Sequence, residues 1–320
     1  MNEKRFWQFA RDNINEYDKV LLLTVTDSSN HSPGRQGFKM LLTPNGSTIG
    51  TVGGGIMEKQ LIDYGFELLS GKEEKQIKRL QHSPKTDLEE SGLICGGYQT
   101  IIFSLLTFNE INSVDKILEN LNKRENGLLK LSYNLFDYDS SQSQKDDCTF
   151  NYENDTDYIY KENIGFTDTA YIIGGGHVGL AVSQIMKFIG FYVVVFDHRE
   201  DVFTMNQNTY ADEKIITDYK DVNQFIKEGS KSYAIIVTPM HMGDKEALGS
   251  VINLDLNYIG MMGSARKIKT VFNNLVKDGL DKKLFDKVHT PIGLEIEAET
   301  PEEIAVSIAA EIISIKRKEE

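Results

Sequence analysis

Apolar side chains in the first half of the chain occur at both helical and strand-like spacings. Between Phe6 and Ile14 they recur at helical spacing, which predicts an amphipathic opening helix. Apolar runs predict strands at residues 20–26, 38–43, 48–52 and 98–106. Pro44-Asn45-Gly46-Ser47 has the composition of a hairpin turn, and a helical pattern covers residues 56–68. These elements predict a mixed α+β N-terminal domain.

From Ala170 onward the pattern becomes regular. Apolar strands are predicted at residues 171–173, 192–196, 233–237 and 258–261, separated by helical stretches. Such an alternation is typical of an α/β fold with a parallel sheet and helices on both faces. We therefore predict a Rossmann-type nucleotide-binding domain over residues 169–320. The N-terminal domain then covers residues 1–168, of which 137–168 form a ragged polar segment.

Composition narrows the classes of partner and compartment. The chain is 40% hydrophobic and 26% charged, with a net charge of -13, and it contains neither a clustered basic face nor a membrane-length apolar run. Nucleic acid and membrane are therefore not expected as partners. The N-terminus lacks signal-peptide features, and the two cysteines, Cys95 and Cys148, suit a reducing compartment, so we expect a cytoplasmic protein.

A glycine turn at residues 174–179 follows the first strand of the second domain. Gly174 permits the tight turn, Gly176 lets the backbone approach a diphosphate, and Gly179 allows close helix packing, while His177 is a positional residue within the turn. Asp197 ends the next strand, where a carboxylate accepts hydrogen bonds from ribose hydroxyls and favours an unphosphorylated ribose. The alternative is a Rossmann-like fold that has lost its ligand.

A second turn, residues 260–267, also lies between a strand and a helix. Arg266 is suited to a phosphate, Gly263 leaves room for it, and Ser264 is suited to capping the helix or donating to the same group. The alternative is a packed turn with a solvated basic first helical turn.

A third glycine run, Gly53-Gly54-Gly55, precedes the predicted helix of the first domain. Its amides form a possible anion cradle, with Arg35 and Lys39 as cations that could balance a phosphate. Glu58 has two possible roles, hydrogen bonding to a polar heterocycle or stabilisation of its own helix N-terminus.

Three further residues have side chains suited to catalysis. Cys95 precedes two glycines and is either a reactive thiol or a buried one. His241 and Asp244 share the loop after the strand predicted at residues 233–237, where their role is either metal binding or proton transfer, or else that of a hydrogen-bonding pair. No metal site is predicted.

Taken in order, these motifs resemble the XdhC/CoxI family, the accessory proteins of xanthine dehydrogenase and other molybdenum hydroxylases. The motifs are Ser32-Pro33, residues 50–55 with Glu58, Cys95-Gly96-Gly97, residues 174–179, residues 258–260 with Gly263-Ser264 and Arg266-Lys267, and residues 291–294 followed by 298–305. Family members often carry Thr-His-x-His-x-x-Asp in the loop where Pro239 replaces the first histidine here, so metal binding there is not expected.

The resemblance implies a maturation factor rather than an enzyme. Such a protein binds the molybdenum cofactor, as molybdopterin or its dinucleotide, while a cysteine desulfurase supplies the terminal sulfur. It then delivers the cofactor to a xanthine dehydrogenase-type hydroxylase, with Cys95 implied in sulfur transfer or a molybdenum contact. A homodimer is also implied. The chain has no cysteine pattern for the iron–sulfur clusters of the hydroxylase itself.

Two other functions fit the same residues. One is an NAD-dependent oxidoreductase, favoured by the glycine turn and Asp197. The other is a nucleotide-sensing regulatory protein whose first domain only contacts partners.

Overall fold

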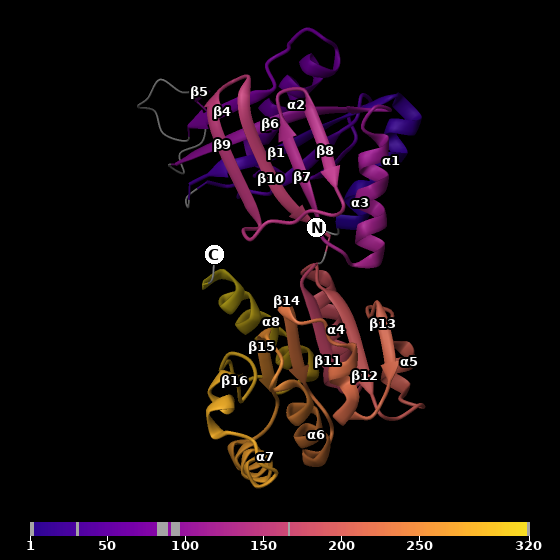
Figure 1. The fold of residues 1–320 in the computed structure, drawn as a ribbon, viewed down its shortest axis with the longest axis vertical. Coiled ribbons are helices and arrows are strands. Elements are labelled where there is room, and N and C mark those ends of the chain that lie inside the picture. Colours follow the sequence, from indigo (N-terminus) through magenta and orange to yellow (C-terminus); the bar gives the residue numbers. More distant parts are fainter. Residues whose placement is uncertain (1–2, 30–31, 82–88, 91–96, 166, 319–320) are drawn as a thin grey trace. The chain divides into compact units, whose positions relative to one another are not determined.

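The computed structural model describes residues 3–29, 32–81, 89–90, 97–165 and 167–318. The chain divides into two compact units, Met1–Phe166 and Thr167–Glu320, whereas the sequence placed the boundary after residue 168 (Figure 1). Within the described parts of the chain, no helix has both the length and the apolar character needed to cross a membrane.

A six-stranded sheet with the order β3-β2-β1-β6-β4-β5 is the centre of the N-terminal unit. All its pairings are antiparallel except β4 with β5. Its strands are β1 (Lys19–Ser28), β2 (Lys39–Leu42), β3 (Thr48–Gly50), β4 (Ile77–Gln81), β5 (Glu89–Glu90) and β6 (Tyr98–Thr107). The unit's helices are α1 (Glu3–Tyr17), α2 (Gly55–Leu69) and α3 (Ile111–Lys123). The apolar run of β1 is buried on both faces, because Val20 and Leu22 pack with α1 and α3, whereas Leu21 and Leu23 pack with α2.

The polar middle of the chain folds into a second, antiparallel sheet with the order β8-β7-β10-β9. Its strands are β7 (Gly127–Ser132), β8 (Leu135–Asp139), β9 (Cys148–Asn154) and β10 (Asp157–Ile164). Tyr138, Tyr158 and Tyr160 are buried in the core shared with α1 and α3. These strands are more regular than the polar composition predicted, because aromatic residues supply the buried face while polar residues occupy the other.

The C-terminal unit contains a six-stranded parallel sheet with the order β13-β12-β11-β14-β15-β16. Its strands are β11 (Thr169–Ile173), β12 (Tyr192–Asp197), β13 (Glu213–Ile216), β14 (Gly229–Ile236), β15 (Leu256–Met261) and β16 (Val288–His289). This is the Rossmann strand order, and it confirms the predicted α/β fold.

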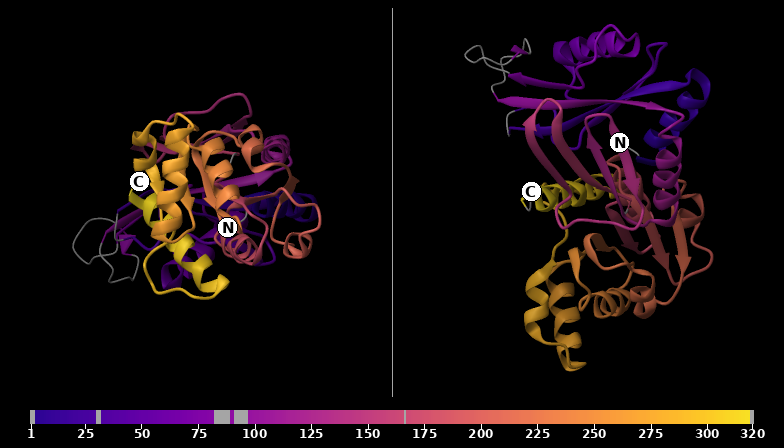
Figure 2. Two further views of the ribbon diagram at one scale, coloured as in Figure 1. Left: turned by 90° about the horizontal axis from the view of Figure 1, so that it is seen from below. Right: turned by 45° about the horizontal axis from the view of Figure 1, so that its top comes forward.

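Helices cover both faces of the parallel sheet (Figure 2). The helical elements are α4 (His177–Phe188), α5 (Phe203–Gln207), η1 (Tyr219–Phe225), α6 (His241–Val251), α7 (Ala265–Lys277), η2 (Lys282–Lys287) and α8 (Pro301–Lys318). Helices α4 and α8 share one core, whereas η1, α6 and α7 share the other. The chain reverses its direction of winding between β11 and β14, so the ligand crevice of this fold lies outside their carboxyl ends.

Candidate functional site

Two glycines of the 174–179 turn are required by backbone packing. Gly174 has a φ of +123°, and a Cβ there would lie 2.6 Å from the carbonyl oxygen of Val237 at the end of β14. A Cβ on Gly179 would lie 2.0 Å from the carbonyl oxygen of Gly174. The glycine turn therefore packs directly against the first helical turn of α4 and against the end of β14, as the sequence predicted.

Gly176 differs because the space around it is open. A Cβ there would meet no atom within 4 Å, and Gly176 is the N-cap of α4 without a side-chain cap. Within the described residues, the amides of His177, Val178 and Gly179 donate to no protein acceptor. Free amides at a helix N-terminus favour an anion, and open space in front of them lets a phosphate approach.

Asp197, at the carboxyl end of β12, is fully buried and bonded within the protein. Its Oδ2 accepts from the Gly175 amide at 2.8 Å and from Nη2 of Arg199 at 2.9 Å. Its Oδ1 accepts from the amide and Nε of Arg199 at 3.1 and 2.9 Å. Burial opposes ionisation, but the bonds from Arg199 and Gly175 outweigh it and hold the pKa of the Asp197 carboxyl below its usual value.

This geometry revises the role predicted for Asp197. An ionised carboxylate offers about four lone-pair positions, and four protein N–H groups already occupy them. The carboxylate is also fully buried, so a ribose hydroxyl would have to displace one of these groups to reach it. The missed residue is Arg199, and the signal that could have revealed it is an arginine two positions after the strand-ending aspartate.

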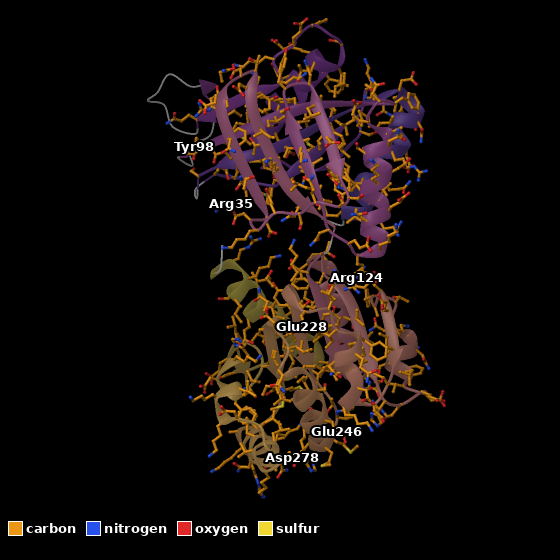
Figure 3. All side chains as sticks on the ribbon, viewed as in Figure 1. Arg35, Tyr98, Arg124, Glu228, Glu246 and Asp278 are labelled. Carbon is orange, nitrogen blue, oxygen red and sulfur yellow. The ribbon has the colours of Figure 1, made fainter. Side chains whose placement is uncertain are left out.

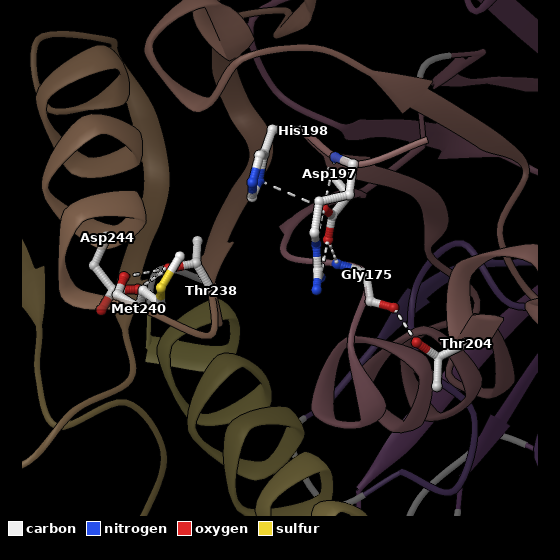
Figure 4. Close-up of polar contacts among 8 residues, drawn as sticks. Gly175, Asp197, His198, Thr204, Thr238, Met240 and Asp244 are labelled. Carbon is white, nitrogen blue, oxygen red and sulfur yellow. Dashed lines mark hydrogen bonds and ion pairs between the residues drawn. The ribbon is translucent and has the colours of Figure 1, made fainter. Parts of the chain in front are cut away.

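The segment after β12 is also fixed to the glycine turn. Thr204 Oγ1 on α5 donates to the Gly175 carbonyl at 2.5 Å, and a Cβ on Gly175 would lie 3.0 Å from Cβ of Met205. Figure 4 shows Asp197, Gly175 and Thr204 as one connected polar group, and Thr238, Met240 and Asp244 as another. The exits of β11 and β12 therefore form a preorganised wall of the crevice.

The predicted pair His241 and Asp244 does not form. Asp244 is fully buried, accepts from Thr238 Oγ1 at 2.6 Å and pairs with the ammonium of Lys267. His241 is exposed at the first position of α6. Burial raises the pKa of the Asp244 carboxyl, although Lys267 and Thr238 oppose the rise. Positions three apart on α6 share a face only approximately, and the histidine here faces solvent while the aspartate faces the core, so a proton-transfer pair is not present.

Among the described residues, no group of three or more histidine, cysteine, aspartate or glutamate side chains is placed to hold a metal ion.

The turn after β15 separates its two cationic residues. Ser264 is the N-cap of α7, and its Oγ accepts from the Lys267 amide at 3.4 Å, which is the capping role considered for it. The side chain of Lys267 pairs with Asp244, whereas Arg266 is exposed. A Cβ on Gly263 would lie 3.1 Å from Cδ of Lys267, so the turn packs against this lysine. Arg266 is thus the side chain of this turn that is free to meet an anion from solvent.

In the N-terminal unit, Glu58 binds its own glycine turn. Its Oε2 accepts from the amides of Val52 and Gly54 at 2.9 and 3.1 Å and from Thr51 Oγ1 at 2.5 Å. Of the two roles considered, the structure shows the stabilisation of the N-terminus of α2. Gly54 and Gly55 have φ values of +77° and +67°, and a Cβ on either would meet no atom within 4 Å. The outer side of the turn is open.

Two N-terminal motifs, the Ser32-Pro33 segment and the glycine run, meet around Gln99 on β6. Ser32 Oγ donates to Gln99 Oε1 at 3.1 Å, and Gln99 Nε2 donates to the carbonyl of Val52 at 2.6 Å. A Cβ on Gly53 would lie 2.9 Å from the Gly34 amide nitrogen. The Ser32-Pro33 segment and the glycine run therefore pack together. Cys95 itself lies outside the described residues.

The two cations expected near this turn have different environments. Lys39 is buried and donates to Glu162 Oε1 at 2.5 Å, so its charge is engaged in an internal ion pair. Arg35 is exposed on the N-terminal unit (Figure 3).

The C-terminal unit is thus a Rossmann-type domain with an open glycine turn, joined to a mixed α+β unit. A family model described as the XdhC Rossmann domain matches residues 170–312, and one described as the XdhC and CoxI family matches residues 14–81. The chain belongs to the XdhC and CoxI family.

The relatives described below share little sequence identity with this chain but align along most of its length. The chain is 22% identical over 326 residues to a Bacillus subtilis protein named as a probable subunit of xanthine dehydrogenase, covering 95% of this chain and 96% of that one. It is 23% identical over 298 residues to the uncharacterised protein YqeB of Escherichia coli K12, covering 91% of this chain but 42% of that longer protein. A crystal structure described as a xanthine dehydrogenase from Bacillus halodurans superposes with a TM-score of 0.76 at 20% identity, over 100% of this chain and 97% of that one. This likeness establishes the shared fold.

Proposed function

We propose that this protein is an accessory factor that binds the molybdenum cofactor and delivers it, after sulfuration, to a xanthine dehydrogenase-type molybdenum hydroxylase. Family membership and the name of the Bacillus subtilis relative support an accessory role in a xanthine dehydrogenase system. The observation that carries the binding step is the open N-terminus of α4, where Gly176 leaves room for a phosphate in front of free amides. The cofactor carries such a phosphate, as molybdopterin or as its dinucleotide.

The remaining parts of this proposal concern sulfur and partners. Cys95 is the residue proposed for sulfur transfer or a molybdenum contact, with a cysteine desulfurase as the donor of the sulfur. A homodimer in the cytoplasm is the proposed working form. Cys148 is not suited to the same role. Its thiol has a pKa raised to about 12, mainly by burial, and the thiolate is the reactive form.

The test of cargo binding is co-elution of the purified protein with molybdopterin. We expect the wild type to retain the pterin on gel filtration and Gly176→Ala to lose most of it, because the added methyl group occupies the phosphate approach. Lys187→Ala, at the opposite end of α4 from the phosphate turn, is the control. A wild-type protein that elutes free of molybdopterin would exclude the cargo-binding role.

The test of sulfur transfer is reconstitution of hydroxylase activity. Cys95→Ala is expected to abolish activation of the hydroxylase, whereas Cys148→Ala retains it. Full activation by Cys95→Ala would instead favour a nucleotide-sensing regulator.

An NAD-dependent oxidoreductase is the competing function, favoured by the Rossmann strand order. The exposed His241 and the occupied carboxylate of Asp197 oppose it. Calorimetry with NAD decides between the two, because an oxidoreductase of this type binds the dinucleotide and the accessory factor does not require it.

A further inference from the structure

The exit of β12 holds a guanidinium where NAD-binding domains hold a free carboxylate. In those domains the acidic residue at this position receives the ribose hydroxyls. Here the four acceptor positions of Asp197 are filled by the Gly175 amide and by three N–H groups of Arg199. A ribose diol would have to displace Arg199 to reach the carboxylate.

Arg199 also lies directly beside the phosphate turn. The Gly175 amide nitrogen and Nη2 of Arg199 lie 2.8 and 2.9 Å from the same oxygen, Oδ2 of Asp197. The guanidinium is therefore a near neighbour of the Gly175 amide, two residues before the start of α4. Asp197 holds it through both Nε and Nη2, which fixes the plane of the guanidinium.

The guanidinium retains donors for a ligand. Its bonds to Asp197 use two of the five N–H groups of an arginine side chain and leave three, including both on Nη1. The side chain is 43% exposed, so these donors are accessible. A planar guanidinium with parallel N–H groups suits a phosphate better than a neutral hydroxyl, because the bonds are charge-assisted.

Two carboxylates follow Arg199 in the sequence and oppose an anion. Glu200 and Asp201 are both exposed to solvent, where salt and water screen their repulsion. Arg199 instead contributes charge-assisted hydrogen bonds at contact distance, from a guanidinium whose plane is already fixed by Asp197.

We propose that Arg199 is a second phosphate-binding element of the crevice, which takes a phosphate monoester at the position where an NAD-binding domain takes ribose hydroxyls. The monoester is either a ribose 2′-phosphate or the terminal phosphate of a ligand seated on the α4 turn. This role reverses the preference for an unphosphorylated ribose that Asp197 alone implied. It does not depend on the identity of the cargo in the proposed function.

The experiment is calorimetry of the full chain with 2′,5′-ADP and with 5′-AMP, probes that differ by the 2′-phosphate. For the wild type, a ribose 2′-phosphate site predicts that 2′,5′-ADP binds at least about tenfold more tightly than 5′-AMP. A site for the terminal phosphate predicts similar affinities for the two. In either case Arg199→Ala loses at least about tenfold in affinity for the probe that the wild type binds best. Lys187→Ala, which removes a lysine from the other end of α4, changes both affinities less than twofold.

Arg199→Gln guards against misfolding, because glutamine still donates to Asp197 but carries no charge. Its affinity is expected to fall as for Arg199→Ala, while circular dichroism shows a folded protein. The proposal is overturned if either folded variant binds both probes as the wild type does, or if the wild type binds neither probe. Retention of molybdopterin by a wild type that binds neither probe would leave the accessory function standing and remove the role of Arg199.

Discussion

Replacement of Lys267 by methionine isolates the contribution of a buried ion pair between α6 and α7. Asp244 is fully buried, and its two partners are the ammonium of Lys267 and the hydroxyl of Thr238. Methionine keeps much of the length and apolar volume of the lysine stem but removes the charge. The variant therefore leaves a buried carboxylate with one hydrogen bond.

The expected cost follows from the burial of each partner. Removal of one member of a buried pair costs about 3–5 kcal/mol, because the other charge stays desolvated and unpaired. Lys267 is 24% exposed, so water reaches its former position, and the bond from Thr238 remains. We expect the free energy of unfolding to fall by about 2–3 kcal/mol at pH 8.

The deficit should depend on pH in a defined direction. Burial already raises the pKa of the Asp244 carboxyl in the folded state, against the lowering effect of Lys267 and Thr238. Without Lys267 the folded-state pKa rises further. Between the unfolded and folded values the folded state binds more protons, so the free energy of unfolding falls as pH rises. The deficit is therefore complete above the folded-state pKa of the variant, and it shrinks as pH falls toward the unfolded value near about 4.

The assay is urea denaturation followed by two probes at pH 8 and pH 5. The single tryptophan, Trp7, is buried in the N-terminal unit, so its fluorescence reports that unit, whereas far-ultraviolet circular dichroism reports both. Lys267→Met should shift part of the dichroism transition and leave the fluorescence transition unchanged.

Lys245→Met is the matched control on the same pair of helices. Lys245 of α6 pairs with Asp278 after α7 at 2.6 Å, with side chains that are 25% and 51% exposed. Such a partly exposed pair contributes about 1 kcal/mol or less. Equal losses in the two variants, or a Lys267→Met deficit that is the same at both pH values, would refute the reasoning about Asp244.

Three further predictions concern the glycine turn, the N-terminal turn and the thiols. Gly179→Ala should prevent stable folding of the C-terminal unit, because its Cβ would lie 2.0 Å from a backbone oxygen. Gly176→Ala should retain the wild-type melting temperature, because a Cβ there meets no atom within 4 Å. Equal melting temperatures for the two variants would contradict this contrast. Glu58→Ala should lower the stability of the N-terminal unit by about 1–3 kcal/mol, with partial recovery in Glu58→Gln, as followed by tryptophan fluorescence. In the Cys95→Ala variant, the remaining thiol of Cys148 should react slowly with a disulfide reagent at pH 8 and at the normal rate in urea. The reason is that burial is the main cause that raises the pKa of this thiol to about 12. Rapid labelling of the native variant would refute this prediction.

Local sequence was sufficient for the elements that bury a continuous apolar face. The run at residues 20–26 became β1, and the regular apolar strands after Ala170 became the parallel sheet in Rossmann order. The packing roles predicted for Gly174 and Gly179 are also confirmed, because they depend on backbone geometry within one strand–turn–helix unit. By contrast, the regular sheet of residues 127–164 was underestimated, since its polar face dominates the composition while buried tyrosines supply its core.

The sequence by itself determined the fold class, the position of the glycine turn and the family, because each depends on local periodicity and on residue types at fixed spacing. Only the tertiary structure decided which charges meet. Asp197 accepts hydrogen bonds from Arg199 and the Gly175 amide, and Asp244 faces away from His241 to meet Lys267. Such pairings depend on which face of a strand end or helix a side chain takes, and on segments that folding brings together. Spacing along the chain therefore indicates where a glycine turn lies, whereas packing decides which side chains near it remain exposed.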